Sequence, residues 1–277
     1  MSTWFITGTT SGIGHETVVA ALAAGHNVVA ASRRPVAVDE LVSAYPERYR
    51  TVALDVTDAG SSAAAIAYAV EEFGGLDVIV NNAGYANTAS IEEGSEEDFR
   101  AQIDVNFYGV YNVTRAALPL LRRQRSGVIV QISSIGGRVA GSAGIAAYQA
   151  AKGAVEAFSD VLRTETEPFG VKVIIVEPGG FRTGWGSGAT GSIVEPGPDY
   201  DASVGDRLRA FATYVGNEPG DPARAAAAIL DAAEASTPPR RLILGSDALE
   251  RARTNFAFEI AEADDWEKVS RSTDFAA

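Results

Sequence analysis

Short apolar, β-branched segments alternate with longer Ala-rich segments over the first 176 residues. The short segments predict strands at residues 4–7, 28–31, 52–54, 78–80, 128–132 and 171–176. The longer segments predict helices around residues 13–24, 61–73, 96–121 and 148–167, several of them opened by Ser, Asp or Thr caps. Parallel strands need helical crossovers that cover both faces of the sheet. The pattern therefore predicts an α/β fold, a Rossmann-like doubly wound parallel sheet.

The regular alternation breaks after residue 176 and returns only near residue 202. The Gly- and Pro-rich stretch 178–198 is too long for an ordinary connection, so we expect a substrate-covering loop near residues 184–200. Helical patterns follow near 202–214 and 222–235, with a last strand at 241–244. Since no repeat or linker interrupts the chain, we expect a single domain over residues 1–277, with a C-terminal extension from about residue 245. The acidic segment from Glu259 fits either a packed helix or a solvated end.

Composition narrows the possible partners. The 277 residues are 46% hydrophobic and 21% charged, which is typical of a globular chain. With 36 acidic and 23 basic residues the net charge is -13, which disfavours nucleic acid as a partner. The chain has no Cys and only two His, His15 and His26, so we expect no metal site. The N-terminus has no basic stretch before its apolar segment and no window of about 20 residues is apolar throughout, so we expect a soluble, cytoplasmic protein without a membrane partner.

A glycine-rich turn follows the first predicted strand. The strand leads into Gly8-Thr9-Thr10-Ser11-Gly12-Ile13-Gly14 and then into an amphipathic helix. Because Gly12 and Gly14 lack side chains, the backbone can approach phosphates closely, and the positive end of the helix faces the anion. The candidate phosphate contacts are Gly8, Thr10, Ser11, Gly12, Ile13 and Gly14. The spacing differs from the common Gly-x-Gly-x-x-Gly, so a tight turn without a ligand remains the alternative.

Tyr148 and Lys152 lie four residues apart in a predicted helix, and so share one face. A nearby ammonium favours the phenolate and would lower the tyrosine pKa from about 10, which suits an acid/base. The alternative is a buried ring beside a snorkelling lysine. Ser134, at the end of strand 128–132, could hydrogen-bond a reacting oxygen, with Ser133 as the fallback. Capping of the next turn is the alternative, and we expect it of Ser133 rather than Ser134.

Together these motifs resemble those of the short-chain dehydrogenase/reductase family, in the family's order, to about residue 244. The motifs are Thr7-Gly8-x3-Gly12-x-Gly14, Asp55-Val56, Asn81-Asn82-Ala83-Gly84, Asn106, Ser133-Ser134, Tyr148-x3-Lys152 and Pro178-Gly179. The tail is similar to the bacterial 17β-hydroxysteroid-dehydrogenase-like branch. Two features depart from the family pattern: the interval from Ser134 to Tyr148 is 14 residues, one more than usual, and Phe107 replaces an aliphatic residue.

The resemblance implies further site residues. Asp55 and Val56 would hold the adenine, and Asn82, Ala83 and Gly84 would shape the strand end beneath the ribose. Lys152 would also bind the nicotinamide ribose, and Asn106 would kink its helix and hold a water that relays protons to Lys152. Pro178, Gly179, Phe181 and Thr183 would hold the carboxamide side of the nicotinamide. The alternatives are a turn or helix cap for Asp55, an exposed helix position for Asn106 and a plain turn for Pro178 and Gly179.

The end of the second strand bears on which nicotinamide cofactor binds. An enzyme that uses NAD usually has an acidic residue there for the ribose hydroxyl, whereas this chain has Ser32. The guanidinium groups of Arg33 and Arg34 can pair with a 2′-phosphate, Arg33 being the stronger candidate. NADP(H) is therefore preferred and NAD(H) remains possible. The alternative is that both arginines form a solvated start to the next helix.

The expected function is hydride transfer between NADP(H) and a small-molecule carbonyl or alcohol, with Asn106, Ser134, Tyr148 and Lys152 as the catalytic set. The alternatives are an epimerase or dehydratase of the extended Rossmann families and an NADPH-binding sensor without turnover. We expect a moderately apolar substrate, with Trp185 and Ile193 as candidate contacts or as plain loop packing. The Ala-rich helices 96–121 and 148–167 suggest a homodimer or homotetramer with a two-fold four-helix interface.

Overall fold

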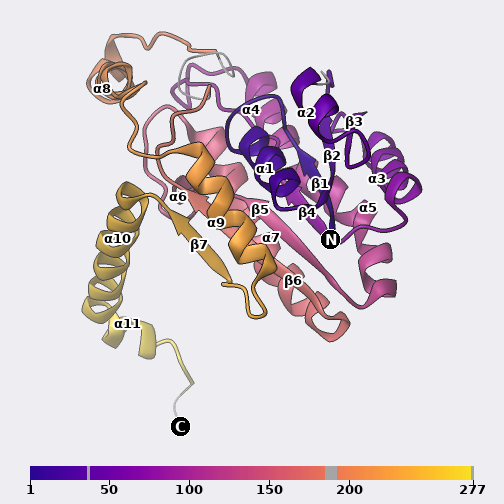
Figure 1. Ribbon diagram of the computed structural model, residues 1–277. Coiled ribbons are helices and arrows are strands. Elements are labelled where there is room, and N and C mark those ends of the chain that lie inside the picture. The colour runs from indigo at the N-terminus through magenta and orange to yellow at the C-terminus, as the bar shows by residue number, and fades with distance from the viewer. Residues whose placement is uncertain (36–37, 185–191, 276–277) are drawn as a thin grey trace.

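A parallel sheet of seven strands forms the centre of the protein in the computed structural model, which describes residues 1–35, 38–184 and 192–275. The strand order is β3-β2-β1-β4-β5-β6-β7 (Figure 1). The strands are β1 (Thr3–Thr7), β2 (Asn27–Ser32), β3 (Tyr49–Ala53), β4 (Val78–Asn81), β5 (Gly127–Ile132), β6 (Val171–Pro178) and β7 (Arg241–Leu244). This architecture confirms the predicted Rossmann-like fold, and among the strands the largest boundary error is at β3, which begins three residues before the predicted residue 52.

Alternation along the strands distributes apolar side chains to two helical layers. On one face, Trp4 and Ile6 of β1 belong to a core with α1 (Gly12–Ala23) and α9 (Pro222–Glu234). On the other face, Phe5 belongs to a core with α3 (Ala59–Phe73), α5 (Gly109–Gln124) and α7 (Ala146–Thr166). Both faces are therefore covered, as an all-parallel sheet requires.

The predicted helix 96–121 is present and extends to Gln124, and the kink that the family resemblance implied at Asn106 falls within it. It divides into α4 (Glu96–Ile103), the π-helical turn η1 (Asp104–Tyr108) and α5. The predicted helix 202–214 is shorter, with α8 (Asp206–Tyr214) following the short turns η3 (Pro198–Tyr200) and η4 (Asp201–Gly205). Single-turn π segments often mark functional sites.

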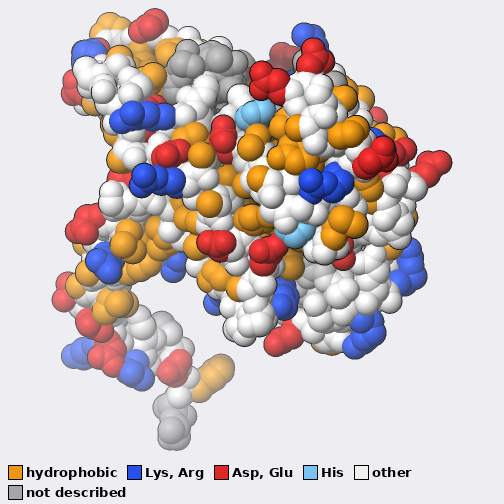
Figure 2. Space-filling view, in the orientation of Figure 1, with side chains coloured by type: hydrophobic (Ala, Val, Ile, Leu, Met, Phe, Trp, Pro, Cys, Tyr) orange, Lys and Arg blue, Asp and Glu red, His pale blue; other side chains and the backbone are white. Residues whose placement is uncertain are grey.

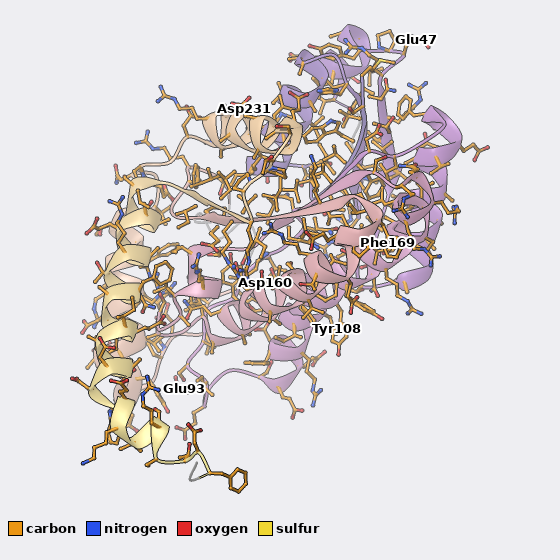
Figure 3. The ribbon with its side chains drawn as sticks, turned by 90° about the horizontal axis from the view of Figure 1, so that it is seen from below. Glu47, Glu93, Tyr108, Asp160, Phe169 and Asp231 are labelled. Atoms are coloured by element: carbon orange, nitrogen blue, oxygen red, sulfur yellow. The ribbon has the colours of Figure 1, made fainter. Side chains whose placement is uncertain are left out.

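In the described residues, α2 (Asp39–Ala44) and α6 (Ile135–Arg138) were not predicted, and the segment from Glu259, for which a helix was one alternative, lies in α10 (Ser246–Asp265) and α11 (Glu267–Arg271). Ala248 and Ala252 near the start of α10 are buried against α6, whereas the side chains of Phe258 and Trp266 farther along are 63% and 60% exposed. In Figures 1 and 3, α10 and α11 run along one side of the molecule, away from α2 and α3. The acidic segment from Glu259 is therefore helical but exposed, and α10 packs on the fold only through the turns before that segment.

The described residues contain no helix that is both long and apolar enough to cross a membrane. Nor do they bring three potential metal-binding side chains of the His, Cys, Asp or Glu type together. On the face shown in Figure 2, acidic and basic side chains are interspersed.

A buried ion cluster fixes the end of β6 next to the site. The Glu177 carboxylate is fully buried and lies 3.0 Å from the Arg241 Nε of β7 and 3.3 Å from the Arg138 Nη1 of α6. Arg241 also pairs with Glu156 and Asp160 of α7, at 3.0 and 2.7 Å. Burial and the Glu156 charge raise the Glu177 pKa, and the two arginines oppose this rise. Arg241 is therefore the cation that joins β6, β7 and α7.

Replacing Arg241 is expected to destabilise the fold, because Glu177 and Glu156 would then lose their shared buried cation. An Arg241→Met variant should lose about 3–5 kcal/mol of unfolding free energy in urea titrations. The matched control is Arg240→Met, because Arg240 is half exposed and pairs with the partly exposed Asp160, which is labelled in Figure 3. This surface pair should contribute little. Equal losses in the two variants would contradict the assignment.

Candidate active site

A cleft of about 1210 Å³ runs along the carboxyl ends of the strands. In doubly wound sheets, ligands bind at this edge, where crossovers leave neighbouring strands in opposite directions. Here that point lies between β1 and β4. Of the predicted site residues, the cleft is lined by Gly8, Thr10, Ser11, Gly12, Ile13, Ser32, Arg33, Arg34, Asp55, Val56, Asn82, Ala83, Gly84, Ser134, Tyr148, Lys152, Pro178, Gly179, Phe181 and Thr183. Gly14 and Asn106 are absent from the lining.

The glycine turn between β1 and α1 leaves backbone donors at one end of the cleft. Gly8 and Gly12 have φ angles of +69° and +62°, which glycine adopts without strain. Ser11, at the N-cap of α1, makes no side-chain capping hydrogen bond. The first N–H groups of α1 therefore keep their capacity to bind an anion.

Gly14 has a structural role here, whereas the sequence predicted a contact with the cofactor phosphates. A Cβ at Gly14 would lie 2.3 Å from the Asn82 Nδ2 and 2.4 Å from the Gly8 carbonyl oxygen. The Asn82 amide occupies this space and donates to the carbonyl oxygens of Thr7 and Gly8, both at 3.0 Å. The Thr7 hydroxyl accepts from the backbone N–H groups of Asn82 and Ala83 at 3.0 Å, a contact that sequence reasoning missed although Thr7 begins the motif. Gly14 thus lets β4 approach the glycine turn.

At the end of β2, Ser32, Arg33 and Arg34 line the cleft, and both arginines are exposed. They precede α2 by several residues, so they do not begin that helix. The Asp55 carboxylate accepts from the Thr57 hydroxyl and backbone N–H at 2.7 and 3.0 Å. These hydrogen bonds lower the Asp55 pKa, and the charge of Arg33 lowers it further. Asp55 therefore caps its own turn, the alternative considered for it, while it also lines the cleft.

Tyr148 and Ser134 meet within the cleft. The Tyr148 pKa is raised by burial, and a side-chain hydrogen bond with Ser134 opposes this rise. The Ser134 Oγ also accepts from the Gly136 N–H at 3.0 Å and so caps α6, whereas the Ser133 hydroxyl points to the Lys152 carbonyl oxygen at 3.5 Å. The expectation that Ser133 is the capping serine was therefore wrong. The 14-residue interval ending at Tyr148 is accommodated by α6 and the loop after it.

Lys152 is 3% exposed, and its Nζ donates to the Ile132 carbonyl oxygen at 2.8 Å. The Nζ lies 5.8 Å from the centre of the Tyr148 ring. Burial lowers the Lys152 pKa to about 8, and the charge of Glu156 opposes this. The expectation that Lys152 lowers the tyrosine pKa was wrong for this arrangement, because burial of the phenol dominates and raises it. Tyr148 is consequently a neutral phenol at neutral pH.

Asn106 lies behind the cleft wall, in the π-helical turn η1, and is fully buried. Its Nδ2 donates to the carbonyl oxygens of Tyr85 and Gln102 at 2.8 and 2.9 Å, and its Oδ1 accepts from the Tyr85 N–H at 3.2 Å. An exposed helix position, the alternative considered, is therefore wrong. Asn106 holds the chain after Gly84 against the irregular helix.

The loop after β6 forms the other wall of the cleft. Its backbone is held by the Gly179 N–H, which donates to the Leu244 carbonyl oxygen at 2.8 Å, and by a bridge between Phe181 and Gly220. The Thr183 side chain lies 3.1 Å from where a Cβ at Gly12 would be, so this loop reaches across to the glycine turn. Cleft residues that sequence reasoning missed include Tyr85, Phe211, Tyr214 and Glu218.

The two candidate substrate contacts have different outcomes. Trp185 lies outside the described residues. Ile193 is 54% exposed, forms a backbone bridge with Thr88 and is absent from the cleft lining. Plain loop packing, the alternative stated for Ile193, fits this position.

The lowered Lys152 pKa predicts a pH-dependent stability. Between pH 8 and 10.5 the unfolded chain would bind a proton that the folded chain lacks, so this lysine makes stability rise with pH. The slope is about 1.4 kcal/mol per pH unit, and it vanishes below pH 8. Urea unfolding of Lys152→Met should lack this rise, whereas the exposed control Lys268→Met should keep it. Parallel curves for the three proteins would contradict the assignment.

The fold and the cleft are those of a Rossmann-type oxidoreductase. The family model for short chain dehydrogenase matches residues 2–190, and the chain belongs to the short-chain dehydrogenase/reductase family. Oxidoreductase BOA17 of Botryotinia fuckeliana is 42% identical over 270 residues, which cover 96% of this chain and 97% of that protein. A crystal structure of a short-chain dehydrogenase from Streptomyces avermitilis is 41% identical, with a TM-score of 0.90, and the match covers 99% of this chain and 100% of that one.

The name of one human relative fits the 17β-hydroxysteroid-dehydrogenase-like branch that the C-terminal tail resembles. The 17-beta-hydroxysteroid dehydrogenase type 6 of Homo sapiens is 45% identical over 183 residues, which cover 65% of this chain and 57% of that protein. The family uses NAD(P)(H) as cofactor. The residues here fit such a dinucleotide, because the glycine turn leaves the first N–H groups of α1 uncapped by Ser11 and the cleft runs from that turn to Tyr148.

Proposed function

We propose that this protein interconverts a carbonyl group and a secondary alcohol with NADP(H), and that Tyr148 is the general acid/base. The observation that carries the proposal is the convergence of the Tyr148 phenol, the Ser134 hydroxyl and the Lys152 ammonium in one cleft with the glycine turn. Phenol and hydroxyl are hydrogen-bonded to each other, so one substrate oxygen can contact both.

We assign a role to each catalytic side chain. The bound nicotinamide supplies or accepts the hydride. Tyr148, whose raised pKa keeps it protonated at neutral pH, donates its proton to the substrate oxygen in the reducing direction. Ser134 stabilises charge that develops on that oxygen. Lys152 would hold the nicotinamide ribose when the cofactor is bound, while Asn106 fixes the Gly84–Tyr85 backbone beside Lys152.

The cofactor would lie along the carboxyl edge of the sheet. The α1 N-terminus would bind the pyrophosphate, Asp55 and Val56 would flank the adenine, and the loop from Pro178 to Thr183 would hold the carboxamide side; residues of all three regions line the cleft. Preference for NADP(H) rests on Arg33 and Arg34, which line the cleft where Ser32 replaces an acidic residue. A guanidinium pairs with a phosphate dianion through charge-assisted hydrogen bonds.

The substrate end of the cleft is aromatic, with Phe181, Phe211 and Tyr214 in its lining. Such walls favour a moderately apolar ketone or secondary alcohol. The human relative's name, a hydroxysteroid dehydrogenase, points to the same substrate class.

The test is a panel of ketones and secondary alcohols with NADPH, NADH and their oxidised forms, followed by nicotinamide absorbance, together with cofactor binding by fluorescence. Turnover of at least one carbonyl, faster with NADPH than with NADH, is the expected result. Tight NADPH binding with no oxidation across the panel would favour the sensor. A product isomerised without net change in absorbance would favour an epimerase.

We further propose that two copies associate through α5, α7 and the turn that precedes α5. Tyr108, labelled in Figure 3, and Val161 are 50% and 58% exposed on these elements, and both could contribute apolar surface to a two-fold contact. Light scattering is expected to report a dimer or tetramer, and a monomer at micromolar concentration would contradict this. The cytoplasmic location inferred from the N-terminal sequence stays a prediction.

A further inference from the structure

Asp247, in the first turn of α10, touches the loop that would hold the nicotinamide. Its Oδ2 accepts from the Gly180 N–H at 2.8 Å and lies 3.4 Å from the Tyr214 hydroxyl of α8. Its Oδ1 is buried and has no hydrogen-bond partner in the described part of the chain. Asp247 lies 67 residues after Gly180, so the contact joins separate parts of the fold.

The loop backbone is shaped around this carboxylate. A Cβ at Gly179 would lie 2.4 Å from the Asp247 Oδ1, so only glycine leaves room for the carboxylate there. The neighbouring backbone of the loop is anchored elsewhere, by the Gly179 N–H on Leu244 and by the bridge from Phe181 to Gly220. Gly180 lies between these two anchors, and its N–H donates to the Asp247 side chain rather than to a backbone carbonyl oxygen.

We propose that Asp247 is a positioning residue for the nicotinamide half of the cofactor. It fixes the backbone of the Pro178–Phe181 loop and, through Tyr214, links that loop to α8 on the substrate side. In Figure 1, α8, the start of α9 and the start of α10 lie at the same end of the molecule, next to the end of β7. The inference rests on the proposed function, since it assumes that this loop contacts nicotinamide.

A purely structural role predicts something different. An acidic residue in the first turn also stabilises a helix through the positive end of its dipole. If that were all, removing Asp247 would lower the melting temperature and would affect both halves of the cofactor site alike or neither. A positioning role affects the nicotinamide half alone, because the adenine half would be bound elsewhere, at the end of β2 and at the turn after β3.

The experiment compares two ligands. NADPH contains the nicotinamide, whereas adenosine 2′,5′-bisphosphate carries only the adenine half and its phosphates. In Asp247→Ala, the Kd for NADPH should rise about tenfold or more, because a charge-assisted hydrogen bond is lost, while the Kd for adenosine 2′,5′-bisphosphate should not change. With a carbonyl substrate, kcat should fall together with the NADPH affinity, because hydride transfer is sensitive to small misplacements.

Two further variants keep the test decisive. Asp247→Asn retains an oxygen that can accept from the Gly180 N–H, so it should recover part of the NADPH affinity. Tyr214→Phe keeps the ring and removes the hydroxyl contact, so its loss of NADPH affinity should be smaller than that of Asp247→Ala. This variant also keeps the proposal testable if Asp247→Ala fails to fold. Glu250→Ala is the matched control, because Glu250 is exposed on the same helix.

The inference is overturned if the two ligands weaken in parallel, if neither weakens, or if Asp247→Asn recovers none of the affinity. Its failure is distinguishable from failure of the proposed function. In the former case the unchanged protein still binds NADPH and reduces a carbonyl. In the latter it reduces no carbonyl of the panel, whether or not it binds NADPH and whatever residue stands at position 247.

Discussion

A Tyr148→Phe variant is expected to lose about 10²–10⁴-fold in kcat while it binds NADPH as the unchanged protein does. Phenylalanine fills the same partly buried space, so the fold and the cofactor cleft should be retained. What is lost is the Tyr148 proton that we propose is donated to the substrate oxygen. The Ser134 hydroxyl also loses its hydrogen bond with Tyr148, and with it the geometry that directs both groups to one oxygen, although it keeps the Gly136 N–H.

The control for this variant is Tyr108→Phe, which makes the same chemical change on the surface. Tyr108 is half exposed and lies outside the cleft lining. Its kcat should stay within about twofold of the unchanged protein, in line with the small effects of surface substitutions. Steady-state rates and NADPH fluorescence titrations measure both properties. An unchanged rate in Tyr148→Phe would remove the assignment of this residue as the acid/base.

An Arg33→Ala variant is expected to weaken NADPH binding by about 10- to 100-fold and NADH binding by less than about threefold. Arg33 lines the cleft at the end of β2, and its positive charge contributes to the lowered pKa of Asp55. A 2′-phosphate would pair with it, whereas a ribose hydroxyl offers no charge to pair with.

The selectivity ratio measured by titration with both cofactors tests this idea better than either affinity alone. Arg34→Ala should show a smaller loss in the same direction, since Arg34 is the weaker candidate. Arg253→Ala on the exposed side of α10 is the matched control and should leave both affinities unchanged. If Arg33→Ala weakened the binding of NADPH and NADH equally, Arg33 would instead contact a portion of the cofactor that both share.

The sequence alone determined the elements of the sheet and most of the cleft lining. Strand pattern, glycine turn and the Tyr148-x3-Lys152 spacing are local properties, because backbone preferences and side-chain periodicity act over a few residues. The carboxyl ends of parallel strands must meet at one edge, so residues that follow these strands were expected together before any coordinates. This is why Ser32, Asp55 and Ser134 line one cleft.

Only the tertiary structure decided what depends on contacts between distant segments. The periodicity of residues 96–121 suits one regular helix. In the structure, however, the Asn106 side chain donates to the carbonyl oxygens of Tyr85, 21 residues away, and of Gln102. Asn106 lies in the π-helical turn that interrupts the α-helical pattern. Burial, which no local pattern gives, reversed the expected direction of the Tyr148 pKa. Asp247 reaches Gly180 because β6 and β7 are neighbours in the sheet, and neighbours across a sheet can be far apart in the chain.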